Sequence, residues 1–140
     1  RSAEVFRAVA PILGLPHRGY LEPPVSESGM PVISITGSRD RTVPPGEWGQ
    51  DTFTTTSDGD VYYYSSASAI TKVWAEAHGC DATVPAEPVD IGSSSMECRG
   101  WSYCQSDSQW PPVMDCRGNV GHVYNLSSSW PLILDFFEQL

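Results

Sequence analysis

The segment Pro31-Val-Ile-Ser-Ile-Thr-Gly-Ser-Arg-Asp40 is the main basis for the fold that we predict from this sequence. Residues 31–36 form an unbroken and largely β-branched apolar run, which is typical of a strand covered on both faces of a parallel sheet. Gly37 closes the run, and Asp40 follows in the loop. Functional groups in open α/β sheets lie beyond the carboxyl ends of the strands, so Asp40 is a candidate for chemistry.

Two further apolar runs, residues 5–10 and 113–116, predict two more buried strands. The regions between the strands, residues 15–29, 41–60 and 81–112, read as loops, the last with at most a short strand or hairpin. The order of elements is therefore strand, strand, helix, strand, helix, which is half of a doubly wound α/β fold. A three-stranded parallel sheet would leave an open edge, so we expect the chain not to fold as a stable monomer.

Two helices complete this pattern. The first is predicted over residues 69–77, where the apolar residues recur at helical spacing, with N-cap candidates at 65–68 and Gly79 as its end. Its predicted apolar face consists of Ile70, Val73, Trp74 and Ala77. The second helix is predicted over residues 130–140, with a serine cap at 127–129 and Pro131 in its first turn.

A histidine follows the third predicted strand, in the pair Gly121-His122. Asp40 alone would suit a turn, and His122 alone an ordinary surface histidine. Together, at the carboxyl ends of two strands, they predict the acid and base of a Ser-His-Asp triad. No G-x-S-x-G motif occurs in the 140 residues, so the serine and the oxyanion hole are expected on residues outside this chain.

Composition narrows the classes of partner and compartment. The net charge is −9 with only eight Lys and Arg, so neither nucleic acid nor a membrane surface is an expected partner. No apolar run reaches the length of a membrane span, and the start of the chain does not have the pattern of a signal peptide. If the protein is secreted, we expect its signal to have been removed. No cofactor is expected.

Four cysteines, Cys80, Cys98, Cys104 and Cys116, lie in the second half of the chain. Their spacing does not fit a zinc site, so no metal is expected, and an even count predicts two disulfides in an oxidising compartment. Sequence alone leaves three connectivities open, and free thiols are the alternative. Short local loops favour the pairs Cys80–Cys98 and Cys104–Cys116.

Four aromatic residues in predicted loops are candidates to stack on an aromatic acyl group or a sugar, with core packing as the alternative. They are Trp48, Trp101, Trp110 and Tyr124. Asn125-Leu-Ser127 is an N-glycosylation motif, for which an unmodified asparagine is the alternative.

Four stretches carry a resemblance to a known family. They are Phe6-Arg-Ala-Val-Ala-Pro11; Thr36-Gly-Ser-Arg-Asp-Arg-Thr-Val-Pro44; the segment from Tyr62 to Cys80, with its Trp74-Ala-Glu-Ala-His-Gly-Cys80 end; and Gly121-His122 with Trp130 and Phe136-Phe137. In this order they resemble the secreted polyhydroxybutyrate depolymerase and feruloyl or acetylxylan esterase group of α/β-hydrolases. The second stretch is similar to the "HGTxDxxVP" segment of that group, with Thr36 in place of its histidine. The last is similar to "GGGHxWP", with Val123 and Tyr124 after the histidine.

The resemblance implies an α/β fold in which residues 1–140 are the C-terminal portion of a single α/β-hydrolase domain. That portion would have three parallel strands with flanking helices, and would be incomplete without an N-terminal half supplied by the same polypeptide or a separate chain. It implies an extracellular carboxyl-ester hydrolase in which Asp40 is the triad acid and His122 the base. Two alternatives remain: an inactive structural or interaction subunit, and a disulfide-stapled carbohydrate-binding module.

Overall fold

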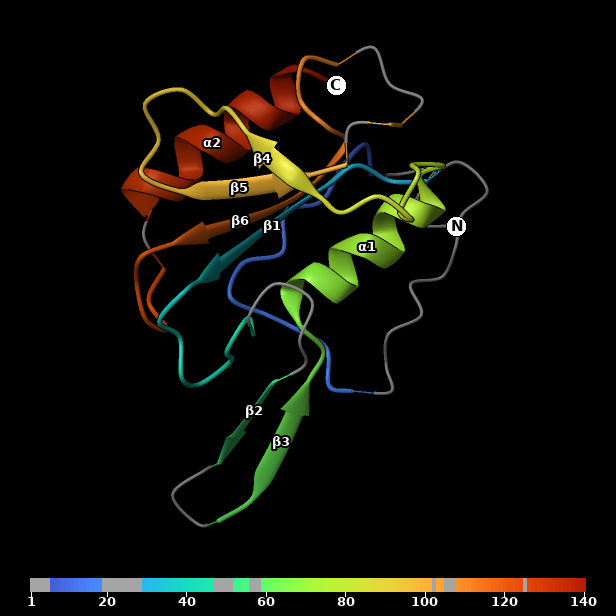
Figure 1. The fold of residues 1–140 in the computed structure, drawn as a ribbon. Helices are drawn as coiled ribbons and strands as arrows, with labels where there is room; N and C mark the ends of the chain where they lie inside the picture. The colour runs from blue at the N-terminus through green and yellow to red at the C-terminus, as the bar shows by residue number, and fades with distance from the viewer. Residues whose placement is uncertain are drawn as a thin grey trace.

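The computed structural model describes residues 6–18, 29–46, 52–55, 59–101, 103–104, 108–124 and 126–140. Its main feature is a four-stranded sheet, shown in Figure 1. The strands lie in the order β1 (Val32–Gly37), β6 (Val113–Gly118), β5 (Glu97–Gly100), β4 (Glu87–Val89). Only β1 and β6 are parallel, whereas β5 pairs antiparallel with β6 and β4 antiparallel with β5. The predicted α/β-hydrolase half with three parallel strands is therefore wrong, because the protein has a small mixed sheet.

The segment before β1 explains part of this difference. Val9 and Ile12 make isolated parallel bridges to β1, but the segment forms no named strand. Pro11 lies between the two bridges and has no backbone N–H to donate, so a continuous ladder cannot form there. The predicted strand at residues 5–10 is thus replaced by two isolated contacts centred slightly later in the chain.

The other part of the difference lies in residues 81–112, which the sequence predicts as a loop with at most a hairpin. This region contributes β4 and β5, which extend the sheet beyond β6 in the antiparallel sense. Each strand has only three or four residues, which is too short for a period-two pattern to emerge clearly.

The two helices cover opposite faces of the sheet, as Figure 1 shows for α1 (Ala67–Ala77) and α2 (Leu126–Glu138). Ile33 and Ile35 of β1 join Met114 of β6 and Phe136 of α2 in one core cluster. On the opposite face, neighbouring strand residues and Ala75 of α1 form a second cluster. Alternate strand residues thus face alternate helices, and the sheet is covered on both sides.

Helix α1 begins close to where the sequence predicts. Ser66 is its N-cap, and its side chain accepts a hydrogen bond from the backbone N–H of Ala69 at 3.2 Å. Gly79 follows the helix with a φ of 79°, a left-handed conformation that glycine adopts without steric cost. The fully buried residues are Ala67, Thr71 and Ala75, whereas the predicted apolar face is only half-buried. Small side chains let the helix approach the sheet closely.

Helix α2 starts at Leu126, four residues before the predicted start, so Pro131 lies inside the helix rather than in its first turn. A second difference is a two-stranded antiparallel sheet, β2 (Thr52–Thr55) with β3 (Val61–Tyr64), within and just after a region predicted as surface loop. In Figure 1 these two strands extend away from the four-stranded sheet.

Two disulfides connect the second half of the chain: Cys80–Cys104 and Cys98–Cys116. Their existence confirms the prediction of two disulfides, but the predicted pairing is wrong. Cys98 and Cys116 face each other directly in the register of β5 and β6, which the sequence did not predict as neighbours. Two disulfides are compatible with an extracellular protein. Among the described residues, no helix is both long and apolar enough to span a membrane.

Candidate active site: an aspartate–histidine pair

The structure brings Asp40 and His122 into direct contact. The Oδ2 atom of Asp40 lies 2.7 Å from Nδ1 of His122, across 82 residues of sequence. Both residues follow the carboxyl ends of the parallel strands β1 and β6, as predicted from the sequence. With Nδ1 protonated, the imidazole donates this hydrogen bond and leaves its other nitrogen, Nε2, as a proton acceptor.

The carboxylate of Asp40 is held on both oxygen atoms. While Oδ2 faces His122, Oδ1 accepts hydrogen bonds from the backbone N–H groups of Thr42 at 2.8 Å and Val43 at 3.0 Å. The side chain of Asp40 is 1% exposed and that of His122 is 42% exposed. A buried, fully bonded carboxylate therefore orients a histidine whose ring is open to an incoming group.

The β1–β6 pairing continues past the ends of the strands and positions the two loops. The N–H of Ser38 donates to Gly118 O at 2.8 Å, and that of Arg39 donates to Val120 O at 3.0 Å. The Arg39 guanidinium adds a bond of 2.6 Å to Asn119 O. These bonds fix the approach of the residues immediately before Asp40 to those immediately before His122.

Gly37 makes this close approach possible. A Cβ atom at this position would lie 2.5 Å from Gly121 O and 2.6 Å from Val120 O, closer than real Cβ contacts. Any other residue would therefore push the His122 loop away from β1. Gly37, which ends the predicted strand, is therefore needed because a side chain at this position would collide with the loop before His122.

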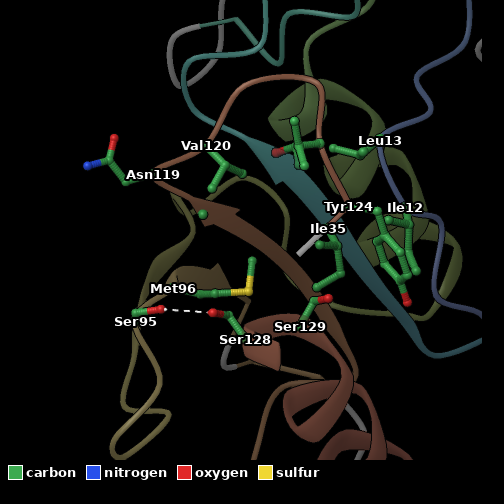
Figure 2. A pocket seen from close by; sticks show the side chains of 13 residues that line it. Ile12, Leu13, Ile35, Ser95, Met96, Asn119, Val120, Tyr124, Ser128 and Ser129 are labelled. Carbon is green, nitrogen blue, oxygen red and sulfur yellow. Dashed lines mark hydrogen bonds between the residues drawn. The ribbon is translucent and has the colours of Figure 1, made fainter. Parts of the chain in front are cut away.

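A groove of about 200 Å³ lies beside the His122 loop (Figure 2). Val120, Val123 and Tyr124, on either side of His122 in sequence, line it. Ile35 of β1 and Met96, immediately before β5, add apolar surface. Ser95 and Ser128 form a hydrogen bond of 3.3 Å at the groove, drawn as a dashed line in Figure 2. The groove combines apolar walls with hydroxyl groups, a composition that suits a small and largely apolar ligand.

The predicted aromatic residues do not gather at one place. Tyr124 lines the groove and is 39% exposed. Trp101 is buried in the core cluster on the α1 side of the sheet, and Trp110 packs half-buried against the cluster on the α2 side. Trp48 and Asn125 lie outside the described residues. Among the described candidates, Tyr124 is thus the one that lies close to His122 in the chain and lines the groove.

Strand β6 carries a buried ion pair that the sequence patterns did not predict. Asp115 Oδ2 and Arg117 Nη2 lie 2.9 Å apart, and their side chains are 1% and 6% exposed. Burial raises the pKa of Asp115, while Arg117 opposes this effect. The signal was present in the sequence, because two opposite charges two residues apart on a strand share one face of the sheet.

Comparison with protein-family models and with curated protein sequences finds no match for this chain.

Proposed function

We propose that this chain supplies the acid and the general base of a serine hydrolase that acts on carboxyl esters, with the nucleophilic serine on a further segment or chain. The observation that carries this proposal is the 2.7 Å contact between the buried carboxylate of Asp40 and Nδ1 of the half-exposed His122. The resemblance of the segments around both residues to secreted esterases favours an ester substrate and an extracellular location.

In this mechanism Nε2 of His122 removes the proton of the serine hydroxyl as its oxygen attacks the ester carbonyl carbon. The resulting imidazolium then protonates the departing alkoxide, and the cycle repeats with water in place of the serine. Asp40 keeps the proton on Nδ1 and stabilises the positive charge of the imidazolium through the short contact with Oδ2. The two backbone N–H bonds to Oδ1 keep the carboxylate from rotating away.

The groove beside His122 is the proposed place for one of the two substrate groups on either side of the ester bond. Its volume of about 200 Å³ accommodates a group of about the size of a benzene ring, since a cavity of roughly 150 Å³ already binds benzene. The apolar side chains of Ile35 and Met96 favour an uncharged acyl or alcohol group, which the Tyr124 ring can contact. The net charge of −9 also disfavours a polyanionic substrate.

An inactive subunit with the same fold is the main alternative, and it differs from the proposal only in whether a serine meets His122. A carbohydrate-binding module is the second alternative. Trp101, one of the residues expected to stack on a sugar, is buried, whereas Trp130 and Tyr103 present exposed rings, so this alternative would use residues other than Trp101.

The test is labelling of the native protein with a fluorophosphonate probe, together with hydrolysis of p-nitrophenyl acetate. The change His122→Ala should abolish both signals, and Asp40→Asn should lower kcat by about 10⁴-fold, as the same change does in a serine protease triad. His17→Ala is the matched control, because this exposed histidine stacks on Tyr64, outside the proposed pair, and should change neither signal. Absence of any labelled serine in the complete native protein would favour the inactive subunit.

A further inference from the structure

The loop that carries Asp40 is fastened at its far end by a buried arginine. Arg117 Nη1 donates a hydrogen bond of 2.6 Å to Gly46 O, between residues 71 positions apart. The neighbouring carbonyl of Pro45 accepts from the N–H of Ala67 at 3.0 Å, at the start of α1. Asp40 at the beginning of this loop and Gly46 near its end are thus both tied to the ends of the parallel strand pair.

The guanidinium of Arg117 is itself held in one orientation. Its Nη2 lies 2.9 Å from Asp115 Oδ2, and its Nε lies 3.4 Å from Asp115 Oδ1, so the two groups meet side by side. Both residues belong to β6 and point to the same face of the sheet, because they are two positions apart. The planar fork of arginine can bond a carboxylate and a carbonyl at the same time, which a lysine cannot do with the same geometry.

This arrangement is costly if its only role is packing. Burying two charges requires desolvation, and apolar residues of similar size often give equal or greater stability. Burial also raises the pKa of Asp115 despite the adjacent cation. What an apolar pair could not do is donate to Gly46 O. The bond to the loop is therefore the feature that distinguishes the ion pair from ordinary core packing.

We propose that Arg117 is a positioning residue for the Asp40–His122 pair, acting through Gly46 on the loop of residues 41–46. The loop in turn presents the N–H groups of Thr42 and Val43 to Asp40 Oδ1. The proposal rests on the proposed function in treating the pair as the reactive unit. The geometry that it predicts can nevertheless be measured without catalytic turnover.

The experiment uses protein labelled with ¹⁵N-histidine and uniformly labelled protein. With only three histidines, the His122 ring nitrogens can be assigned from His17→Gln and His78→Gln spectra. In the wild type we expect the proton on Nδ1 and slow hydrogen exchange at the amides of Thr42 and Val43. Arg117→Lys should shift His122 toward a mixture of tautomers and speed exchange at those two amides by about 10- to 100-fold, the range of a hydrogen bond to a charged group.

Arg99→Lys is the matched control. Arg99 lies opposite Asp115 in the register of β5 and β6, pairs with the exposed side chain of Glu97, and its charge also acts to lower the pKa of Asp115. The bond to Gly46 O, however, comes from Arg117. This change should leave the His122 tautomer and the two amides as in the wild type. An equal effect of both substitutions would overturn the proposal, because the response would then come from the charge cluster as a whole.

The double variant Asp115→Leu/Arg117→Met separates loss of the bond to Gly46 from general unfolding. It removes both buried charges together, so no unpaired charge is left in the core. We expect the amide of Val32, which donates to Pro112 O in the core, to stay protected while Thr42 and Val43 lose protection. Unchanged protection of Thr42 and Val43, with an unchanged tautomer, would overturn the proposal. Equal loss of protection at all three amides would also overturn it, since Arg117 would then serve general stability only. Loss of esterase activity alone would bear on the proposed function and not on this inference.

Discussion

Substituting Gly37 by alanine tests whether the Asp40–His122 contact depends on the close approach of two loops. Gly37 ends β1 and pairs in register with Gly118 at the end of β6. A Cβ atom on Gly37 would lie 2.5 Å from Gly121 O, whereas an ordinary contact begins at 3.4 Å. The backbone before His122 must therefore move by about 0.9 Å (3.4 minus 2.5), or the strand end must give way.

The change in the free energy of unfolding caused by Gly37→Ala is the difference between a steric cost and an entropic gain. Forcing extra volume into a packed site costs about 1–3 kcal/mol, and here the obstacle is backbone, which cannot rotate aside as a side chain would. Replacing a strand glycine by alanine returns roughly 0.5–1 kcal/mol from the lower entropy of the unfolded chain. The difference between the two terms is about 0–2.5 kcal/mol, and we expect a loss in the free energy of unfolding toward the upper end, because the obstacle is backbone, with the His122 ring displaced from Asp40.

Gly118→Ala provides a matched control at the paired position. Its Cβ would meet only the side-chain atoms Val120 Cγ2 at 3.6 Å and Met96 Cε at 3.8 Å, both ordinary contacts. We expect this variant to be as stable as the wild type or more stable by about 0.5 kcal/mol. Urea unfolding of the three proteins, with the ¹⁵N spectrum of His122, measures both effects. If Gly37→Ala unfolds at the wild-type urea concentration and keeps the His122 tautomer, the reasoning about the loop approach is refuted.

Replacing Cys80 and Cys104 by alanine should lower the free energy of unfolding by about 3 kcal/mol, because the bridge closes a loop of 24 residues; non-reducing peptide mapping would contradict the pairing if it joined either cysteine to another partner. Ser66→Ala should cost about 1 kcal/mol in thermal unfolding, since it removes the N-cap bond to Ala69, whereas Ser66→Gly should cost only a few tenths. Burial raises the pKa of Asp115 above 3.8, so the folded protein holds this proton more tightly than the unfolded chain. The stability that Asp115 contributes relative to Asp115→Asn should be greatest below its unfolded pKa and fall as the pH rises through the raised value; a difference that grows with pH in urea unfolding would show that the ion pair outweighs burial.

Local sequence signals were sufficient for the central part of the fold. The apolar run that begins at Pro31 forms β1, and the run that begins at Val113 forms β6, its parallel neighbour. The serine cluster before α1 supplied the N-cap at Ser66, and Gly79 follows the end of that helix in a left-handed conformation. Each of these features depends on residues close together in the chain, so a local pattern can specify it.

The outer part of the sheet was not predictable in the same way. Strands β4 and β5 have three and four residues, and their pairing with β6 depends on contacts between distant segments. The disulfide pairing was predicted wrongly for the same reason, because the pairing of β5 with β6 was not predicted. Loop length favoured Cys104–Cys116, which are only 12 positions apart (116 minus 104), whereas the register of β5 and β6 joins Cys116 to Cys98 across 18 positions. A short loop is a weaker constraint than direct opposition across two bonded strands.

The order of residues was enough to predict an acid and a histidine after two buried strands, because the carboxyl ends of parallel strands lie at the same edge of a sheet. Three features could be seen in the folded protein but not in the sequence. Asp40 contacts His122, Gly37 has no room for a side chain, and Arg117 donates to Gly46 O. These are distances between segments about 70 to 85 residues apart in the chain. They depend on how the whole sheet and its loops pack together. A local pattern of residues carries no information about such long-range packing.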